Sequence, residues 1–88
     1  MYEYILFRQN NHGLTEFYGG PMFTNDMPAM LQNDSCWGSV TSPAVTDCLI
    51  CRWPEPADAL KWRDWCNRYI PDRKRYKVNC IFKGDVIL

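Results

Sequence analysis

Cys48 and Cys51 stand three positions apart, a spacing that occurs in zinc sites and in thiol redox sites. A structural zinc site needs four Cys or His ligands, usually as two close pairs, and the chain has only this one close pair. The single histidine, His12, is distant in sequence. A thiol redox pair needs its first cysteine at the N-terminus of a helix, but Pro54 and Pro56 separate Cys51 from the next predicted helix. We therefore interpret both cysteines as packing residues of a strand and expect no metal and no cofactor. A small zinc or thiol protein is the third functional hypothesis.

Residues that could support catalysis are sparse. The chain has one histidine, no glycine-rich phosphate loop and no Gly-x-Ser-x-Gly motif. One histidine and five cysteines permit a Cys–His pair on paper, but so do many proteins without activity. We predict that the chain is not an enzyme.

The charges balance overall, with ten Lys and Arg against ten Asp and Glu, but their distribution is uneven. The segment 68–83 interleaves aromatic residues with cations and contains one acid, Asp72. Such a pattern can bind nucleic acid, and this is the alternative functional hypothesis. The cations of the segment are Arg68, Arg73, Lys74, Arg75, Lys77 and Lys83.

The periodicity of apolar residues predicts the elements that must position these side chains. In chain order they are strands over 2–9 and 14–18, a short helix capped by Thr24 or Asn25 and ending at Leu31, strands over 36–40 and 45–53, a helix over 57–69 and a strand over 75–83. On the last strand Tyr76, Val78, Cys80 and Phe82 alternate with polar residues.

The helix over 57–69 has the clearest amphipathic pattern, and Pro71 ends it. Trp65 lies at the border of its apolar arc and Leu60 lies off the arc, so we expect both to be exposed in part. Asp64 and Arg68 are spaced for an ion pair on the polar side. The arc itself consists of Ala59, Trp62, Cys66, Tyr69 and Ile70.

These elements predict a single α+β domain over residues 1–88, an antiparallel sheet with one main helix and one short helix. Two arrangements are open. One is a ferredoxin-like βαββαβ fold with an N-terminal hairpin arm, and the other is a meander with the main helix lying on it.

Four tryptophans, five tyrosines and four methionines are more than a core of this size easily hides, and these types are enriched in interfaces. We predict a non-enzymatic protein–protein interaction module that acts by occlusion, as phage-type inhibitors or modulators of a host enzyme or defence complex do. The N-terminus lacks the pattern of a signal peptide and no apolar run could span a bilayer, so we expect a cytoplasmic protein without membrane contact. Homodimerisation through the same face or a sheet edge is also open. The expected partner-binding residues are Leu60, Trp65, Arg68, Arg73, Lys74 and Arg75.

Overall fold

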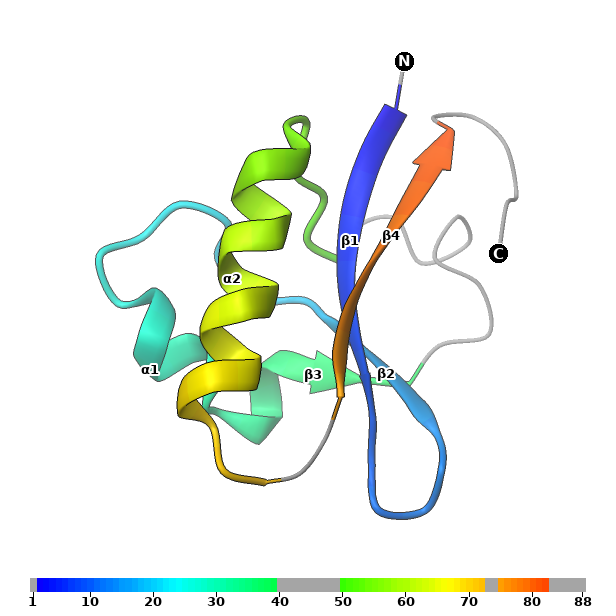
Figure 1. Cartoon of the computed structure of the whole chain (residues 1–88), viewed down its shortest axis with the longest axis vertical. Helices are drawn as coiled ribbons and strands as arrows, with labels where there is room; N and C mark the ends of the chain where they lie inside the picture. Colours follow the sequence, from blue (N-terminus) through cyan, green and yellow to red (C-terminus); the bar gives the residue numbers. More distant parts are fainter. Residues whose placement is uncertain (1, 40–49, 73–74, 83–88) are drawn as a thin grey trace.

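Four antiparallel strands form one sheet in the order β3-β2-β1-β4 (Figure 1). The computed structural model describes residues 2–39, 50–72 and 75–82. The strand β1 is central and pairs with β2 at Phe7 and Phe17 and with β4 at Leu6 and Val78. The strands are β1 (Tyr2–Gln9), β2 (Thr15–Tyr18), β3 (Trp37–Gly38) and β4 (Tyr76–Phe82).

Two α-helices pack on one face of this sheet (Figure 1). They are α1 (Met27–Leu31) and the longer α2 (Pro56–Tyr69), and a 3-10 turn, η1 (Asp34–Cys36), precedes β3. Proline starts α2, where its missing N–H costs nothing, and the helix ends before Pro71. Ala59 and Cys66 are the buried residues of α2, and these small side chains let the helix approach the sheet closely.

Aromatic rings fill much of the core between the helices and the sheet. The ring of Tyr18 stacks on Trp53 at 5.9 Å and meets the edge of Trp37 at 5.4 Å, and Trp37 in turn contacts Tyr76 at 5.4 Å. Two of these rings bond to backbone carbonyls: Trp37 Nε1 donates to Leu31 O at 3.0 Å, and the Tyr18 hydroxyl donates to Pro21 O at 2.8 Å. Two of the four tryptophans, Trp37 and Trp53, are therefore buried in the core, and the other two, Trp62 and Trp65, are partly buried against it.

The predicted α+β class, with one main and one short helix on an antiparallel sheet, is confirmed. Among the described strands only β1, β2 and β3 follow the order of a meander, because β4 lies beside β1 rather than beside β3. The ferredoxin-like alternative is not formed, because it would need a parallel neighbour for β1. That side of β1 is instead occupied by antiparallel partners. They are β2 and, beyond its end, an isolated bridge from Tyr4 to Trp53.

The predicted strand over 45–53 is only partly described, because residues 45–49, with Cys48, lie outside the described residues. The remainder is not a regular strand. Cys51 N–H donates to Tyr18 O at 2.9 Å, and Trp53 exchanges two 2.9 Å backbone bonds with Tyr4. Cys51 is buried, as its interpretation as a packing residue requires, and burial raises the pKa of its thiol to about 12.

Two positions that the sequence assigns to apolar faces are exposed. Tyr69, the last residue of α2, is 58% exposed, because the helix ends there and its ring contacts Trp65 and Arg68 on the helix surface rather than the core. On β4, burial decreases from Tyr76 through Val78 to Cys80, which is exposed although the alternation points it toward the core. The core thus ends before the strand does.

Candidate functional site

Three aromatic rings form a row along one side of α2. The ring centroids of Trp62 and Trp65 are 6.4 Å apart, and those of Trp65 and Tyr69 are 5.5 Å apart. Spacings of three and four residues place these side chains on adjacent turns of the same side. Trp62 and Trp65 are half-buried, and Tyr69 is exposed. We call Trp62, Trp65 and Tyr69 the aromatic flank.

Two cations lie over the aromatic flank. The ammonium of Lys61 is 4.7 Å from the centroid of the Trp62 ring, and the guanidinium carbon of Arg68 is 5.5 Å from that of Tyr69. Seven residues separate the two cations, so they lie about 10 Å apart along the helix axis. Both side chains are exposed, and contacts of this kind contribute roughly 0.5–1 kcal/mol each at such sites.

The predicted ion pair between Asp64 and Arg68 is not present. The carboxylate of Asp64 accepts instead from its neighbour Arg63, with Nη2 at 2.7 Å. Asp64 projects to another side of α2 than the aromatic flank, because about 100° of rotation separates successive residues. Arg68 is therefore left beside Tyr69 with its positive charge available at the surface.

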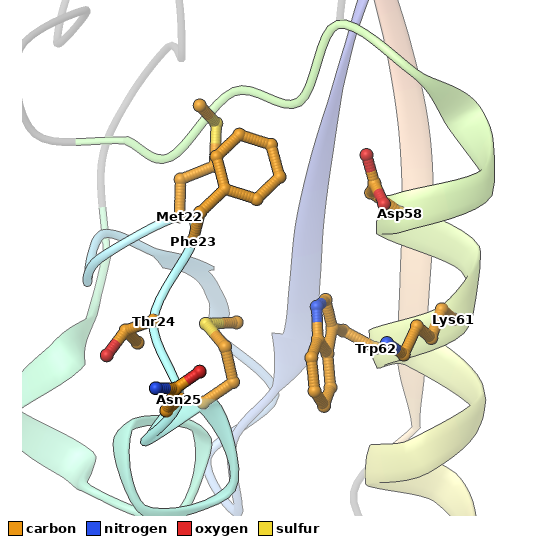
Figure 2. Close-up of a pocket in the computed structure, with 8 residues that line it drawn as sticks. Met22, Phe23, Thr24, Asn25, Asp58, Lys61 and Trp62 are labelled. Carbon is orange, nitrogen blue, oxygen red and sulfur yellow. The ribbon is translucent and has the colours of Figure 1, made fainter.

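A groove adjoins the aromatic flank where α2 faces the loop before α1. Its volume is about 550 Å³. Figure 2 shows Phe23 extending from the loop and Trp62 from α2 into the space between them, with Asp58 and Lys61 along the helix side. Phe23 is 65% exposed, the highest value among the large apolar residues described. The groove is lined by Met22, Phe23, Thr24, Asn25, Met27, Asp58, Lys61 and Trp62.

The structure brings together only some of the residues predicted to bind a partner. Trp65 is half-buried on the aromatic flank, and Arg68 is exposed beside it. Leu60 is exposed as predicted, but five residues of helix rotate it by about 140° from Trp65, onto the opposite flank. Arg75 is exposed just before β4. Arg73 and Lys74 lie outside the described residues.

Sequence reasoning missed the residues that complete the surface. Trp62 was assigned to the core arc, and its half-buried side chain does pack against the core, but it also lines the groove. Met22 and Phe23 belong to no predicted element. An aromatic residue two positions after the turn-forming Gly19, Gly20 and Pro21 was the one available signal, since loops lie on the surface.

A second polar cluster surrounds Arg8, whose side chain points into the core face of β1 and is 2% exposed. Its Nε donates to Glu16 at 2.9 Å, its Nη2 to Asp34 at 3.0 Å and its Nη1 to the Tyr76 hydroxyl at 3.4 Å. The guanidinium also lies 4.4 Å from the centroid of the Trp37 ring. Burial opposes the charge, but the hydrogen bonds outweigh it and hold the pKa of Arg8 above its ordinary value.

This Arg8 cluster joins β1 to β2, β4 and η1. The Tyr76 hydroxyl, which accepts from Arg8, donates to Asp72 at 2.7 Å, and burial followed by this bond raises the pKa of Tyr76. A cavity of about 240 Å³ adjoins the cluster. Because the guanidinium is engaged by acids of the protein itself, we interpret the cluster as structural rather than as an anion site.

The chemistry of metal and thiol sites finds little support in residues 2–39, 50–72 and 75–82. No group of three His, Cys, Asp or Glu side chains in these ranges could hold a metal ion. Burial raises the pKa of the Cys66 thiol to about 12, as it does for Cys51, so neither supplies a thiolate near neutral pH.

Comparison of the chain with protein-family models, with curated proteins and with solved structures finds no match. Within the part of the chain that the structure describes, no helix has the length and apolar character needed to cross a bilayer. The surface of the domain is therefore the available guide to its function.

Proposed function

We propose that this domain is a protein-binding module that docks on its partner through the aromatic flank of α2. The observation that carries the proposal is the row of Trp62, Trp65 and Tyr69, open to solvent in part and accompanied by Lys61 and Arg68. Tryptophan, tyrosine and arginine dominate the energetically important positions of protein interfaces. The rings of tryptophan and tyrosine are large and lose little conformational entropy on binding, so three such side chains in a row can supply most of the affinity.

The effect of docking would be steric. The aromatic flank and its two cations offer rings and positive charge for binding but no Ser, Thr, Cys or His side chain, so the direct effect would be to cover or to recruit the surface that they bind. This is the mode of action of small inhibitors and modulators, including phage-type modulators of host enzymes or defence complexes. We place the domain in that class and in the cytoplasm as part of the same proposal.

The test uses the full chain as bait and compares two substituted forms of it. A protein captured from an extract is identified, purified and titrated against the chain by calorimetry. We expect a one-to-one complex that the double substitution Arg68→Glu/Tyr69→Ala weakens by 30-fold or more, corresponding to about 2 kcal/mol. Both positions are exposed, so the chain should stay folded, and the loss of the Arg68–Tyr69 contact should lower the melting temperature by only about 2–8 °C.

Leu60→Ala is the matched control, because Leu60 is exposed on the opposite flank of the same helix. It should change the affinity by less than 3-fold. Equal binding by the Arg68→Glu/Tyr69→Ala chain and the unchanged chain would contradict the proposal. So would a partner that is a nucleic acid, bound with a steep salt dependence and lost on charge reversal of Arg75 and Lys77. Self-association that Tyr69→Ala abolishes would identify the partner as a second copy.

A further inference from the structure

We propose that the groove between α2 and the loop over 22–25 receives a bulky apolar side chain of an acidic partner segment, whose carboxylates lie against Lys61 and Arg68. This inference deepens the proposed function and rests on it. It names the chemistry of the partner rather than only the surface that binds it.

The groove has the size of a site for an inserted side chain, and its lining combines four apolar side chains with the polar Thr24, Asn25, Asp58 and Lys61. Its volume of about 550 Å³ falls within the range of about 300–1,000 Å³ that ligand pockets occupy. Met27 is buried at its base, and the exposed ring of Phe23 and the ring of Trp62 extend into it (Figure 2). Methionine is flexible and polarizable, so Met22 and Met27 can adjust to side chains of different shape.

The rim of the groove can bond to the backbone of a peptide. The carboxylate of Asp58 and the amide of Asn25 make no hydrogen bond or ion pair with any other residue of the described ranges. The Asp58 carboxylate can accept a hydrogen bond from a peptide N–H, and the Asn25 amide can donate one to a peptide C=O or accept one from an N–H. These are the backbone groups on either side of an inserted side chain. Asp58 also lies in the first turn of α2, where the helix dipole stabilises its charge.

The charges beside the groove favour an acidic segment. Lys61 and Arg68 stand on the aromatic side of α2 and contact rings, not carboxylates. Asp58 is the acid among the groove residues, one turn before Lys61 and farther from Arg68. The ammonium of Lys61 already covers the Trp62 ring, so that ring face is not open to a cation of the partner.

A protein segment fits these features better than a nucleic acid. Phosphate backbones are bound by rows of cations, and here an unpaired carboxylate, Asp58, stands within the groove itself. An apolar floor formed by Met27 is matched by a side chain but not by a phosphate. We therefore assign the groove to a peptide that combines one bulky apolar residue with neighbouring Asp or Glu.

The experiment selects a displayed library of random twelve-residue peptides on the immobilised full chain. Enriched peptides should share a bulky apolar residue next to Asp or Glu. A second selection on the Lys61→Glu/Arg68→Glu chain should replace those acids with Lys or Arg. Peptides from the first selection should lose 10-fold or more in affinity for the charge-reversed chain.

Phe23→Ala tests the groove, and Leu14→Ala is its control, because both are exposed apolar residues outside helices and Leu14 is not part of the groove. We expect a loss of 10-fold or more for Phe23→Ala and less than 2-fold for Leu14→Ala. Binding that survives Phe23→Ala but is lost with Tyr69→Ala overturns the groove assignment and leaves the proposed function standing.

The remaining outcomes are equally decisive. If both selections enrich the same peptide consensus, or if the consensus lacks Asp and Glu, the assignment of an acidic partner is wrong but the assignment of the groove stands. No enriched peptide, or peptides that no substitution on α2 or in the groove affects, overturns the inference. Binding of the oligonucleotide dT12 with the same dependence on Lys61 and Arg68 overturns both the inference and the proposed function.

Discussion

The substitution Arg8→Met should lower the free energy of unfolding by about 3 kcal/mol. Methionine keeps an apolar stem of similar length, so the change removes mainly the charge and its hydrogen bonds. The partners contribute unequally because their exposure differs: the side chain of Glu16 is 19% exposed, whereas that of Asp34 is 83% exposed. A charge-assisted bond to a shielded carboxylate contributes roughly 1.5–3 kcal/mol, but an exposed ion pair contributes about 0–1 kcal/mol.

The contact of Arg8 with the Trp37 ring adds to this loss. At 4.4 Å from the centroid and shielded from water, it contributes about 2 kcal/mol. A methionine sulfur beside the same ring recovers about 0.3–1.5 kcal/mol of that, so the net loss stays near 3 kcal/mol. Breaking a buried ion pair by removing one partner costs about 3–5 kcal/mol in other proteins, and the partial exposure of Glu16 places Arg8 at the lower limit. For a domain of this length, 3 kcal/mol corresponds to a decrease of about 12–24 °C in melting temperature.

Urea titration followed by tryptophan fluorescence measures this loss, since Trp37 and Trp53 are buried in the folded chain. Asp34→Asn is the control and should cost less than about 1 kcal/mol. Combining Arg8→Met with Glu16→Gln should cost less than the two single losses together, because each removes the same bond. A loss below about 1 kcal/mol for Arg8→Met, or an equal loss for Asp34→Asn, would refute the reasoning.

Two further predictions concern packing and pH. A Cβ at Gly20 would lie 2.5 Å from the hydroxyl oxygen of the buried Tyr18, so Gly20→Ala should destabilise by about 1–3 kcal/mol, whereas Gly38→Ala, which has open space, should change the melting temperature little. Burial raises the pKa of Cys51 and Cys66 from 9.0 to about 12, so the folded chain holds these protons more tightly than the unfolded chain. Their contribution to stability is complete below pH 9 and is lost between pH 9 and 12, by up to about 1.4 kcal/mol per pH unit for each thiol. Urea titrations in reducing buffer at pH 8 to 10 check this: stability should fall above pH 9 and less steeply for Cys66→Ala, and an unchanged stability would contradict it.

The elements that the sequence predicts best are those whose patterns depend only on neighbouring residues. The strand over 2–9 was predicted with the bounds that β1 has, and the helix over 57–69 differs from α2 by one residue at its start. Alternation and the 3.6-residue repeat need no knowledge of the rest of the chain. The strand predicted over 45–53 was wrong for residues 50–53, because their pairing depends on distant residues. Trp53 forms a bridge with β1 beyond the point where β2 ends, at Tyr18, and the residues 50–53 do not by themselves specify that point.

The candidate site was predicted in part. Trp65 and Arg68 follow from the amphipathic pattern of the helix alone. The groove does not, because it joins the loop at Phe23 to Trp62, and these residues are far apart in the sequence. The exposure of Leu60 was predicted correctly, but Leu60 lies on the flank of the helix opposite Trp65. Exposure alone does not place two residues on the same flank.

The sequence by itself determined the class of the domain, the positions of its main helix and central strand, and the surplus of large aromatic residues. Only the tertiary structure decided how that surplus is divided: Trp37 and Trp53 are buried in the core, while Trp62 and Trp65 are half-buried at its edge and remain partly open at the surface. It also placed Arg8, which as a charged residue would be expected in solvent, among carboxylates and rings in the interior. Burial is a property of distant neighbours, and it is set by which elements meet across the sheet rather than by the local pattern of any one of them.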